Sequence, residues 1–374
     1  MKNSKVLLLT LRTFSLTGGI EKVSQTFTKT LDDLKSNGEL QSYQVLSMYD
    51  DQADPKYVPK NHFKGFNGNR FAFGLAAIKQ GLKANILVIS HAHLLIFAKI
   101  IRQLKPSIRI VLFAHGIEIW NVLSNWKKKL LNKVEIWAVS QYTAEQIMRQ
   151  QGVSQSQIIV LNNSLDPFFK PTGTLSKPDL LLAKYGLEAR QQVLLTICRL
   201  SSTEQYKGYD MVIECLNQLI ETHPDLVYLL VGKADEIELT RINQLITSFD
   251  LQQNIILTGF LPESELDLHY QLADVFIMPS KAEGFGLVFI EAAARGCAVI
   301  AGNTDGSRDA LLNGGLGIMV NPNDKTEITQ AIVTALQNGK QETVQKKCLA
   351  GFGYEAYKNK VTELLKQKDI TTYD

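Results

Sequence analysis

The residues with the clearest chemical potential lie in the segment 279–296, where two glutamates enclose a glycine-rich turn. Glu283 precedes the turn and Glu291 follows eight positions later, with Gly284 and Gly286 between them. A turn that joins a strand to a helix binds phosphate well, because the first helical turn leaves N–H groups unpaired and the helix dipole is positive there. Glycine also lets the backbone approach a ligand closely. The segment therefore predicts a diphosphate site.

The two glutamates suit the hydroxyl groups that flank a diphosphate in a nucleotide sugar. Glu291 lies one helical turn after Leu287, where its carboxylate can accept both hydrogen bonds of a ribose diol. Glu283, at the mouth of the turn, can accept from sugar hydroxyls. The residues expected to line the diphosphate are Phe285, Gly286, Leu287 and Val288. Together these positions predict a donor site for a sugar nucleotide.

Two cations are placed to neutralise a departing diphosphate. Arg199 follows an expected strand at 193–198, and Lys207 lies in the loop after it. Ligands of open α/β sheets bind at the carboxyl ends of the strands, so both cations fall at a binding edge. The sequence has no Asp-x-Asp pair to hold a divalent metal to phosphates. We therefore expect side chains to stabilise the developing charge, with no metal or other cofactor.

The first half of the chain contains a similar but weaker set of residues that follow expected strands. Gly18 and Gly19 stand between an expected strand and helix, where they could bring a second helix N-terminus to the phosphates or the acceptor. His115 follows another expected strand and precedes a glycine, which suits a hydrogen bond to the donor sugar or the acceptor. His91 and His93 flank one alanine, but no carboxylate or thiol lies near them in the sequence. We do not expect them to bind a metal.

The elements that must position these residues alternate between short apolar runs and amphipathic stretches. This alternation predicts parallel strands separated by helices, in sheets that are covered on both faces. Segment 50–69 is rich in turn-forming residues and is expected to be a loop, and segment 167–178 resembles an interdomain linker. The expected strands are 5–11, 44–48, 86–89, 108–113, 135–139, 158–161, 193–198, 227–231, 255–257, 275–278, 298–301 and 317–320.

Composition supports a globular protein of two α/β domains. The chain has 374 residues, of which 45% are hydrophobic and 21% are charged. We find no apolar run long enough to span a membrane and no signal peptide, so we expect the chain to stay in the cytoplasm. The four cysteines are widely spaced without a metal-binding rhythm and are expected to be reduced, buried thiols.

Charge is distributed unevenly along the chain. Residues 1–170 hold 22 Lys and Arg against 11 Asp and Glu, and within 56–133 the balance is 14 basic residues against one acidic residue. Such a surface suits nucleic acid, an anionic membrane or a lipid phosphate. Lys127, Lys128 and Lys129 stand beside Trp126 and two leucines, which favours a membrane surface over nucleic acid. We hypothesise peripheral association with the inner membrane face.

These residues together resemble family 4 of the retaining glycosyltransferases, which have two facing Rossmann-like doubly wound domains in the arrangement called GT-B. The resemblance covers nearly the whole chain. The matching features are the pair Glu283 and Glu291, which resembles the family's E-x7-E motif, the cations Arg199 and Lys207, the glycines Gly18 and Gly19, His115, the turn 162–166, and the final helix 352–365 with Tyr354 and Tyr357.

The resemblance implies roles for these positions. Glu283 would contact the donor sugar, Glu291 the ribose, and the backbone of Phe260 and Leu261 the base. The implied domains are 1–170 for the acceptor and 171–351 for the nucleotide sugar, with 352–374 as a helix that crosses back to the first domain. The implied reaction is a metal-independent transfer of a hexose with retention, in which the departing diphosphate oxygen helps to deprotonate the acceptor. We expect UDP-glucose as the donor, with GDP-mannose as the competitor, and a lipid-linked or polysaccharide-precursor acceptor.

Three departures and two alternatives accompany the resemblance. Arg199 and Lys207 are eight positions apart, about three more than is usual in the family. Cys198 stands where the family commonly has glycine, and Asp309 stands where many members have glutamate. A nucleotide-sugar epimerase and a binding protein without catalysis fit the same architecture. A nicotinamide dehydrogenase is disfavoured, because no Gly-x-Gly-x-x-Gly follows the first expected strand.

Overall fold

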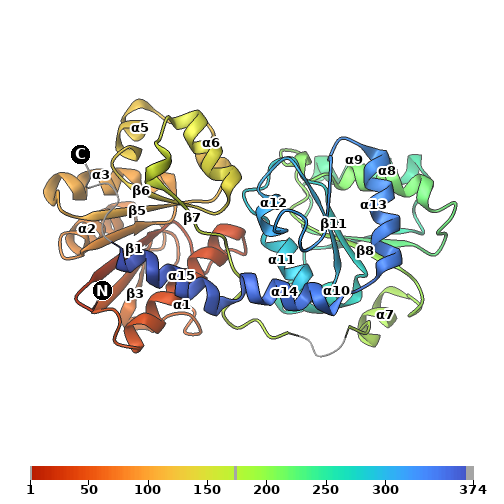
Figure 1. The fold of residues 1–374 in the computed structure, drawn as a ribbon, viewed down its shortest axis with the longest axis horizontal. Helices are drawn as coiled ribbons and strands as arrows, with labels where there is room; N and C mark the ends of the chain where they lie inside the picture. Colours follow the sequence, from red (N-terminus) through yellow and green to blue (C-terminus); the bar gives the residue numbers. More distant parts are fainter. Residues whose placement is uncertain (1, 172–174, 368–374) are drawn as a thin grey trace. The chain divides into compact units, whose positions relative to one another are not determined.

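The computed structural model describes residues 2–171 and 175–367, which divide into two compact units (Figure 1). Unit 1 contains Met1–Phe168 together with Phe352–Asp374, and unit 2 contains Phe169–Gly351. The first boundary thus lies two residues before the expected one, and the second coincides with it. Parts of the expected linker and C-terminal segment, residues 172–174 and 368–374, lie outside the described residues.

The described part of unit 1 contains a seven-stranded parallel sheet in the order β3-β2-β1-β4-β5-β6-β7. Six strands lie within two residues of their expected positions. The seventh, β3, lies inside segment 50–69, so our expectation of a loop there was wrong; β3 forms because Phe63 pairs with Val45 of β2. The strands are β1 (Lys5–Thr10), β2 (Ser42–Ser47), β3 (Phe63–Gly65), β4 (Ile86–Ile89), β5 (Arg109–Ala114), β6 (Glu135–Ala138) and β7 (Ile158–Val160).

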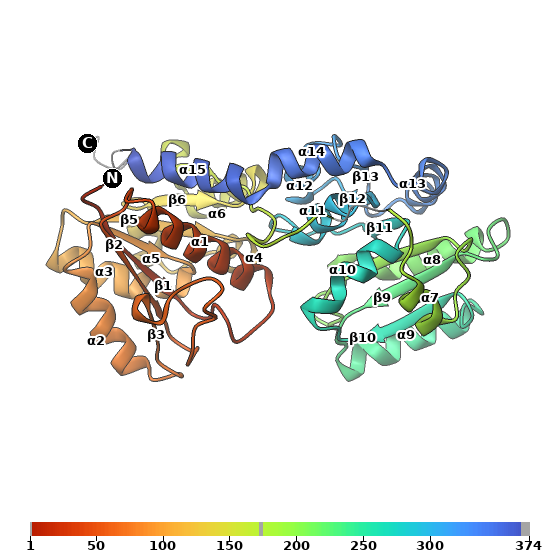
Figure 2. The same cartoon turned by 90° about the horizontal axis from the view of Figure 1, so that it is seen from below.

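Helices cover both faces of this sheet, as Figure 2 shows for α1 and α15 on one face and α2 and α3 on the other. Alternate side chains of a strand point to opposite faces of the sheet, and Leu7 and Leu9 of β1 pack in the cluster under α2 and α3. On the other face, Phe27 of α1 packs edge-on against Phe113 and Trp137. The helices are α1 (Gly19–Ser36), α2 (Arg70–Gly81), α3 (Leu95–Leu104), α4 (Ile117–Trp120), α5 (Asn125–Leu131), α6 (Gln141–Gln151) and α15 (Tyr354–Lys366), with 3-10 turns η1 (Lys60–His62), η2 (Ala92–Leu94) and η3 (Gln155–Gln157).

The C-terminal helix α15 is an integral part of unit 1. Arg109 of β5 forms a buried ion pair with Glu135 of β6 at 2.8 Å. The same guanidinium donates hydrogen bonds to the carbonyl oxygens of Leu364 and Gln367, both at 3.0 Å. At the other end of the helix, the Tyr354 hydroxyl donates to Asp33 of α1 at 2.7 Å. The Arg109 bonds satisfy carbonyls at the end of α15, which a helix cannot pair by itself, and the Tyr354 bond fixes its start.

Unit 2, within its described residues, has a six-stranded parallel sheet in the order β10-β9-β8-β11-β12-β13. All its strands overlap the expected ones. They are β8 (Val193–Ile197), β9 (Val227–Val231), β10 (Ile255–Gly259), β11 (Val275–Met278), β12 (Ala298–Gly302) and β13 (Ile318–Val320). The helices are α7 (Asp179–Tyr185), α8 (Tyr209–Leu219), α9 (Glu236–Ser248), α10 (Glu263–Leu272), α11 (Leu287–Ala294), α12 (Ser307–Ala310), α13 (Lys325–Asn338) and α14 (Glu342–Phe352), with the 3-10 turn η4 (Gln205–Lys207).

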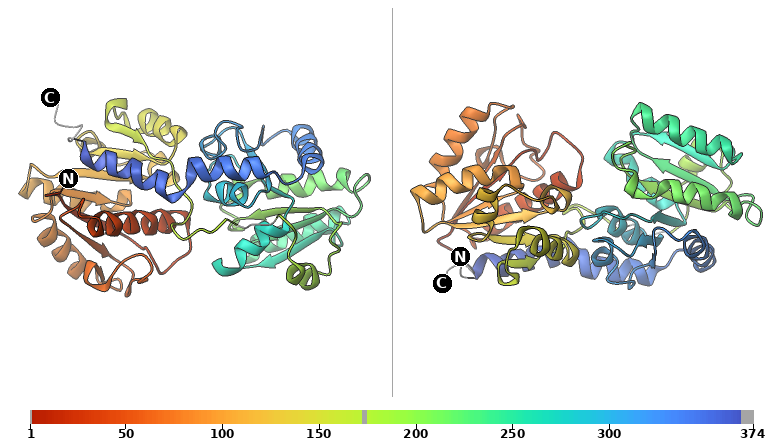
Figure 3. Two further views of the ribbon diagram at one scale, coloured as in Figure 1. Left: turned by 60° about the horizontal axis from the view of Figure 1, so that its bottom comes forward. Right: turned by 90° about the horizontal axis from the view of Figure 1, so that it is seen from above.

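The two sheets explain why the strands read as continuous apolar runs. Every residue of β5 and of β11 is buried, because a parallel sheet is packed on both faces. Figure 3 shows the resulting layers within each unit. The predicted fold class, α/β with two Rossmann-like doubly wound domains, is confirmed. In the described residues, none of the helices combines the length and the apolarity that crossing a bilayer requires.

Candidate functional site

The direction of strand succession in unit 2 reverses between the neighbouring strands β8 and β11. The two strands pair at Leu194 with Val275 and at Leu195 with Phe276. Past these pairs, the Thr196 hydroxyl donates to the Ile277 carbonyl and continues the link. Such a switch point leaves a crevice at the carboxyl ends of the strands, which is where open α/β sheets bind ligands. The loops that follow β8 and β11 carry the predicted site residues.

Lys207 and Glu283 meet at this switch point. Lys207 comes from the loop after β8, Glu283 comes from the loop after β11, and the lysine Nζ donates to the Glu283 Oε1. Both side chains are largely buried, at 15% and 14% exposure. Burial lowers the pKa of Lys207, but the Glu283 carboxylate more than offsets this, so the net pKa lies above its ordinary value. Lys207 therefore carries a full positive charge at neutral pH.

Arg199 lies at the rim of the same group of charges. Its side chain is 69% exposed and pairs with Glu204 at 2.8 Å. Tyr206 lies next to Lys207, whose Nζ is 5.2 Å from the centroid of its ring, and burial raises the pKa of this tyrosine to about 12. Lys207 and Glu283 thus meet at the switch point, and Arg199 lies in the same loop as Lys207.

The turn before α11 has the geometry of an anion site. Gly286 is the N-cap residue with φ of 85°, and a Cβ there would lie 2.4 Å from Cδ2 of Phe289. Only glycine fits this position without strain. No side chain caps the helix start, so no capping group competes with a ligand for the N–H groups of its first turn. Phe285 is buried at 2% exposure, which leaves only its backbone for a ligand.

Asp305 holds the Glu283 loop in place, and our sequence reasoning missed it. Its Oδ2 accepts the Glu283 N–H at 2.6 Å, and its Oδ1 accepts the Ser307 N–H at 3.0 Å. The Gly306 N–H in turn donates to the Glu283 carbonyl at 2.9 Å. Burial raises the pKa of Asp305 to about 6. The signal was present in the sequence, since an acidic residue follows the strand 298–302 at the same sheet edge.

An Asp305→Asn variant is expected to lower kcat by about tenfold, because an amide NH₂ would face one of the two N–H donors that the carboxylate now accepts. In the parent protein, donor binding and kcat should weaken as pH falls through about 6, where the Asp305 carboxyl gains its proton. The variant should lose this acid limb. Steady-state kinetics between pH 5 and 8 measures both effects.

The matched control for that variant is Asp324→Asn. Asp324 caps α13 in the same unit and likewise accepts two N–H groups, those of Thr326 and Glu327. Asp324→Asn should cost little stability, because asparagine caps a helix as well as aspartate does, and it should leave the pH profile unchanged. The pKa of Asp305 in the folded state lies above its usual value, so the folded state binds more protons than the unfolded state between about pH 4 and 6. The contribution of Asp305 to the free energy of unfolding therefore falls as pH rises through that window. An acid limb retained in Asp305→Asn would refute the assignment.

Glu291 lies on α11, one turn inside the helix, and has a partner that the sequence did not indicate. The hydroxyl of the buried Tyr270 donates to its Oε2 at 2.8 Å. Burial, followed by the Glu291 charge, raises the pKa of Tyr270 well above its ordinary range. A neutral phenol thus fixes one carboxylate oxygen. Phe260 and Leu261 follow β10 at the edge of the sheet, where the Phe260 ring is 61% exposed.

The glycine loop of unit 1 is organised by Asp50. The buried carboxylate accepts the N–H groups of Thr13 at 2.6 Å and Ser15 at 2.9 Å, which fixes the loop between β1 and α1. Gly18 is the N-cap of α1, which has no side-chain cap either, and Gly19 begins the helix. Asp50 lies in the segment we predicted as loop, and its role depends on contacts 35 to 37 residues away.

His115 lies at the carboxyl edge of the same sheet, after β5. Its ring Nε2 is 3.0 Å from the Ser90 carbonyl oxygen, and its backbone N–H donates to the Glu118 carboxylate at 2.6 Å. Burial lowers the pKa of His115 to about 4. A neutral ring that meets a carbonyl through Nε2 must carry its proton there, which leaves Nδ1 as an acceptor. Burial also lowers the pKa of His91 to about 4, and Glu118 and His115 are among the groups that act on it.

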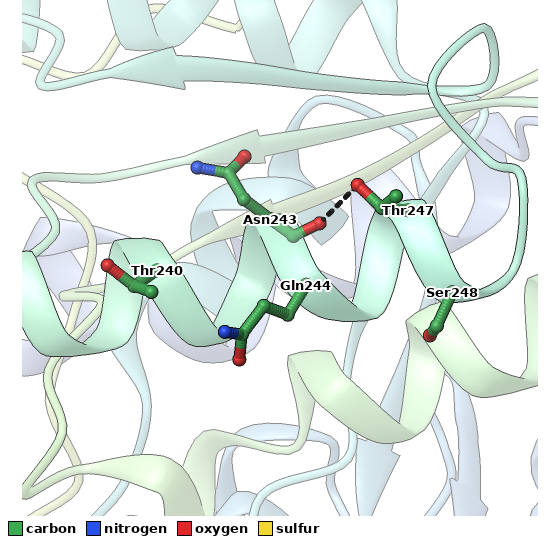
Figure 4. A pocket seen from close by; sticks show the side chains of 5 residues that line it. All are labelled: Thr240, Asn243, Gln244, Thr247 and Ser248. Carbon is green, nitrogen blue, oxygen red and sulfur yellow. Dashed lines mark hydrogen bonds between the residues drawn. The ribbon is translucent and has the colours of Figure 1, made fainter.

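The site residues thus fall into two groups, each defined within its own unit. Unit 2 pairs Lys207 with Glu283 just before the start of α11, and Arg199 lies in the same loop as Lys207. Unit 1 places His115 and the glycine loop at the carboxyl edge of its own sheet. The surface depression on α9 drawn in Figure 4 belongs to neither group. Its lining is polar but uncharged: Thr240, Asn243, Gln244, Thr247 and Ser248.

The comparison with protein families matches residues 180–348 to the model described as glycosyl transferases group 1. The chain is 29% identical over 239 residues to a GDP-mannose-dependent α-(1-6)-phosphatidylinositol monomannoside mannosyltransferase of Mycolicibacterium smegmatis, which covers 60% of each protein. It is 25% identical over 194 residues to the α-monoglucosyldiacylglycerol synthase of Acholeplasma laidlawii, covering 52% of this chain and 47% of that one. These matches span less than two thirds of the curated relatives.

Solved structures show the same fold over a longer stretch. The crystal structure of HepE from Anabaena in complex with UDP aligns with a TM-score of 0.78, 20% sequence identity, and coverage of 96% of this chain and 99% of that chain. At this identity the likeness concerns the fold alone. It includes both α/β units.

Proposed function

We propose that this chain, whose residues 180–348 match the glycosyl transferases group 1 family and which has the GT-B fold, is a retaining, metal-independent hexosyltransferase. It transfers a hexose from a nucleoside diphosphate sugar to a lipid-linked or polysaccharide-precursor acceptor. The single observation that carries the proposal is the contact of Lys207 with Glu283 at the switch point of unit 2, next to the uncapped start of α11.

Each part of the donor has a proposed partner in unit 2. The diphosphate lies at the N–H groups of Leu287 and Val288, where the helix dipole favours negative charge. Lys207 and Arg199 neutralise the charge that develops as the glycosidic bond to the diphosphate breaks. Glu283 accepts hydrogen bonds from the sugar, Glu291 accepts them from the ribose, and the segment with Phe260 and Leu261 meets the base. The paired lysine and glutamate are thereby positioned before the donor arrives.

The chain need not supply a general base in this scheme. The departing diphosphate oxygen takes the proton of the acceptor hydroxyl on the same face of the sugar, so the configuration at the anomeric carbon is retained. His115, neutral with an open Nδ1, accepts a hydrogen bond from the sugar or the acceptor rather than exchanging a proton. Because the cations are side chains, turnover is expected to persist in EDTA.

The acceptor and the donor are the finer parts of the proposal. The names of the curated relatives include a phosphatidylinositol mannoside and a diacylglycerol as glycosylated lipids, which supports a lipid acceptor. The basic first half of the chain supports an anionic one, reached from the cytoplasmic face of a membrane. For the donor we propose UDP-glucose. GDP-mannose is the second candidate, because a relative named as GDP-mannose-dependent is 29% identical to this chain over 239 residues.

A thermal-shift screen of UDP-glucose, GDP-mannose and ADP-glucose tests the donor. The correct one, at about 100 times its dissociation constant, should stabilise the protein by about 2.7 kcal/mol, and the others should do so far less. Release of nucleoside diphosphate must then depend on an added lipid acceptor. Release of nucleoside diphosphate without glycosylation of the acceptor would indicate hydrolysis instead. Interconversion of the donor sugar without release would indicate an epimerase. Binding of the donor without any reaction would indicate a binding protein.

A further inference from the structure

Two neighbouring helices of unit 1 expose apolar side chains along their outer faces. On α2 and its C-cap these are Phe71, Leu75 and Leu82, with exposed fractions of 78%, 57% and 42%. On α3 they are Ile96 and Leu104, with 41% and 59%. The spacings of four, seven and eight residues place each set on one side of its helix. Large apolar side chains rarely gather on a protein surface without a binding partner.

These exposed faces are not a poorly packed part of the core. The opposite faces of the two helices are fully engaged with the sheet through Phe73, Ala77, Leu95, Ala98 and Ile101. The helices also approach each other closely, so their outer faces adjoin. A Cβ on Gly74 would lie 3.1 Å from Cε1 of Phe97, and one on Gly81 would lie 2.6 Å from Cδ1 of Ile101. Figures 1 and 2 show α2 and α3 side by side.

Positive charge surrounds this α2–α3 face, and acidic side chains are missing from the sequence around it. Residues 56–133 hold 14 basic side chains and a single acidic one, Glu118, which lies outside both helices. Lys79 and Lys83 are exposed beside Leu75 and Leu82. The patch that we hypothesised from the sequence lies on α5, but Leu130 and its neighbour Leu131 are buried there at 7% and 0% exposure. The largest set of exposed apolar side chains in the described part of unit 1 therefore lies on α2 and α3.

We infer that the α2–α3 face docks on the surface of an anionic lipid bilayer. Apolar side chains flanked by lysines match the two layers of such a surface, acyl chains below and anionic headgroups above. A second copy of the chain is a poorer occupant, because a symmetric contact would bring two basic patches together, and neither α2 nor α3 has an acidic side chain to pair with them. The inference deepens the proposed function, on which it rests for the reason why the enzyme meets a membrane.

The docked face also leads to the proposed acceptor site. Both helices begin at the carboxyl edge of the sheet, α2 after β3 and α3 after β4. The same edge carries Gly18, Gly19 and His115. Phe71 and Ile96, near the starts of the two helices, therefore lie at the end of the face that adjoins this edge, and a lipid headgroup at the bilayer surface reaches it without leaving the membrane.

Vesicle co-sedimentation of the full chain tests the inference. We expect binding to phosphatidylcholine vesicles that contain about 30% phosphatidylglycerol, and loss of that binding in about 0.5 M NaCl or with phosphatidylcholine alone. The double variants Phe71→Ser with Leu75→Ser and Lys79→Glu with Lys83→Glu should each lower the partition coefficient by about tenfold or more. These side chains are exposed, so thermal melts should match the parent protein.

Matched controls come from unit 2. Ile237→Ser removes an equally exposed apolar side chain, and Lys233→Glu reverses an exposed lysine, so both should bind vesicles like the parent. Binding that survives both double variants would overturn the inference, as would concentration-dependent dimerisation that only the apolar double variant abolishes. Failure of the proposed function is a separate result, namely vesicle binding as expected with no release of nucleoside diphosphate from any donor.

Discussion

Replacing Lys207 by alanine is expected to reduce kcat by about 10²- to 10³-fold, the loss seen when one preorganised charge partner of a transition state is removed. Lys207 is largely buried, and its pKa lies above the ordinary value because the attraction of Glu283 outweighs burial. It therefore needs no reorganisation when negative charge appears on the leaving diphosphate. KM should change less than kcat, because that charge is greatest in the transition state. Steady-state release of nucleoside diphosphate gives both constants.

Three variants separate this role from a structural one. Lys233→Ala removes an exposed lysine of the same unit and should leave kcat unchanged. Lys207→Arg keeps the charge and should restore part of the rate. Lys207→Ala combined with Glu283→Gln removes the carboxylate that the single variant leaves buried without its partner, so it should recover stability but not kcat. A single variant with the kcat of the parent would disprove the leaving-group role.

Replacing Arg109 by methionine should lower the free energy of unfolding of unit 1 by about 3–5 kcal/mol, because it leaves the Glu135 carboxylate buried without its partner. Glu135 is fully buried and also accepts the Trp137 indole N–H at 2.6 Å. The same change frees the carbonyls of Leu364 and Gln367, so α15 should lose its protection against hydrogen exchange first.

Tryptophan fluorescence follows this unit alone. All three tryptophans of the chain, Trp120, Trp126 and Trp137, belong to unit 1. Urea titration of Arg109→Met can therefore be compared with that of Lys366→Met. The control removes Lys366 of α15 from its more exposed ion pair with Glu39. That control should cost only about 0–1 kcal/mol. Equal losses in the two variants would contradict the importance of the buried pair.

The fold was largely predictable because its signals are local. An apolar run of four to six residues followed by an amphipathic stretch produces a strand and then a helix from neighbouring side chains alone, as in β1 and α1. The turn at Gly286 was predictable for the same reason, since only glycine tolerates its φ of 85°. The strand β3 was not, because its three residues become a strand only through pairing with β2.

The donor site could be predicted by residue type but not by contact. Glu283, Glu291, Arg199 and Lys207 were chosen for their chemistry and for their place after strands, and their roles stay predictions. Asp305 was missed because the Glu283 N–H reaches its carboxylate only when β11 and β12 are neighbours. The contact of Tyr270 with Glu291 could not be predicted either, because the two residues lie on different helices.

The sequence by itself determined the alternation of strands and helices, the glycine turn and the kinds of charge at its ends, because each depends on side chains a few positions apart. Tertiary structure alone decided which distant residues meet: Lys207 with Glu283 across 76 positions, Arg109 with Leu364 across 255, and the placement of apolar residues on the outer side of α2 and α3. The reason is that strand order sets these encounters, and strand order depends on how whole elements pack rather than on any local pattern.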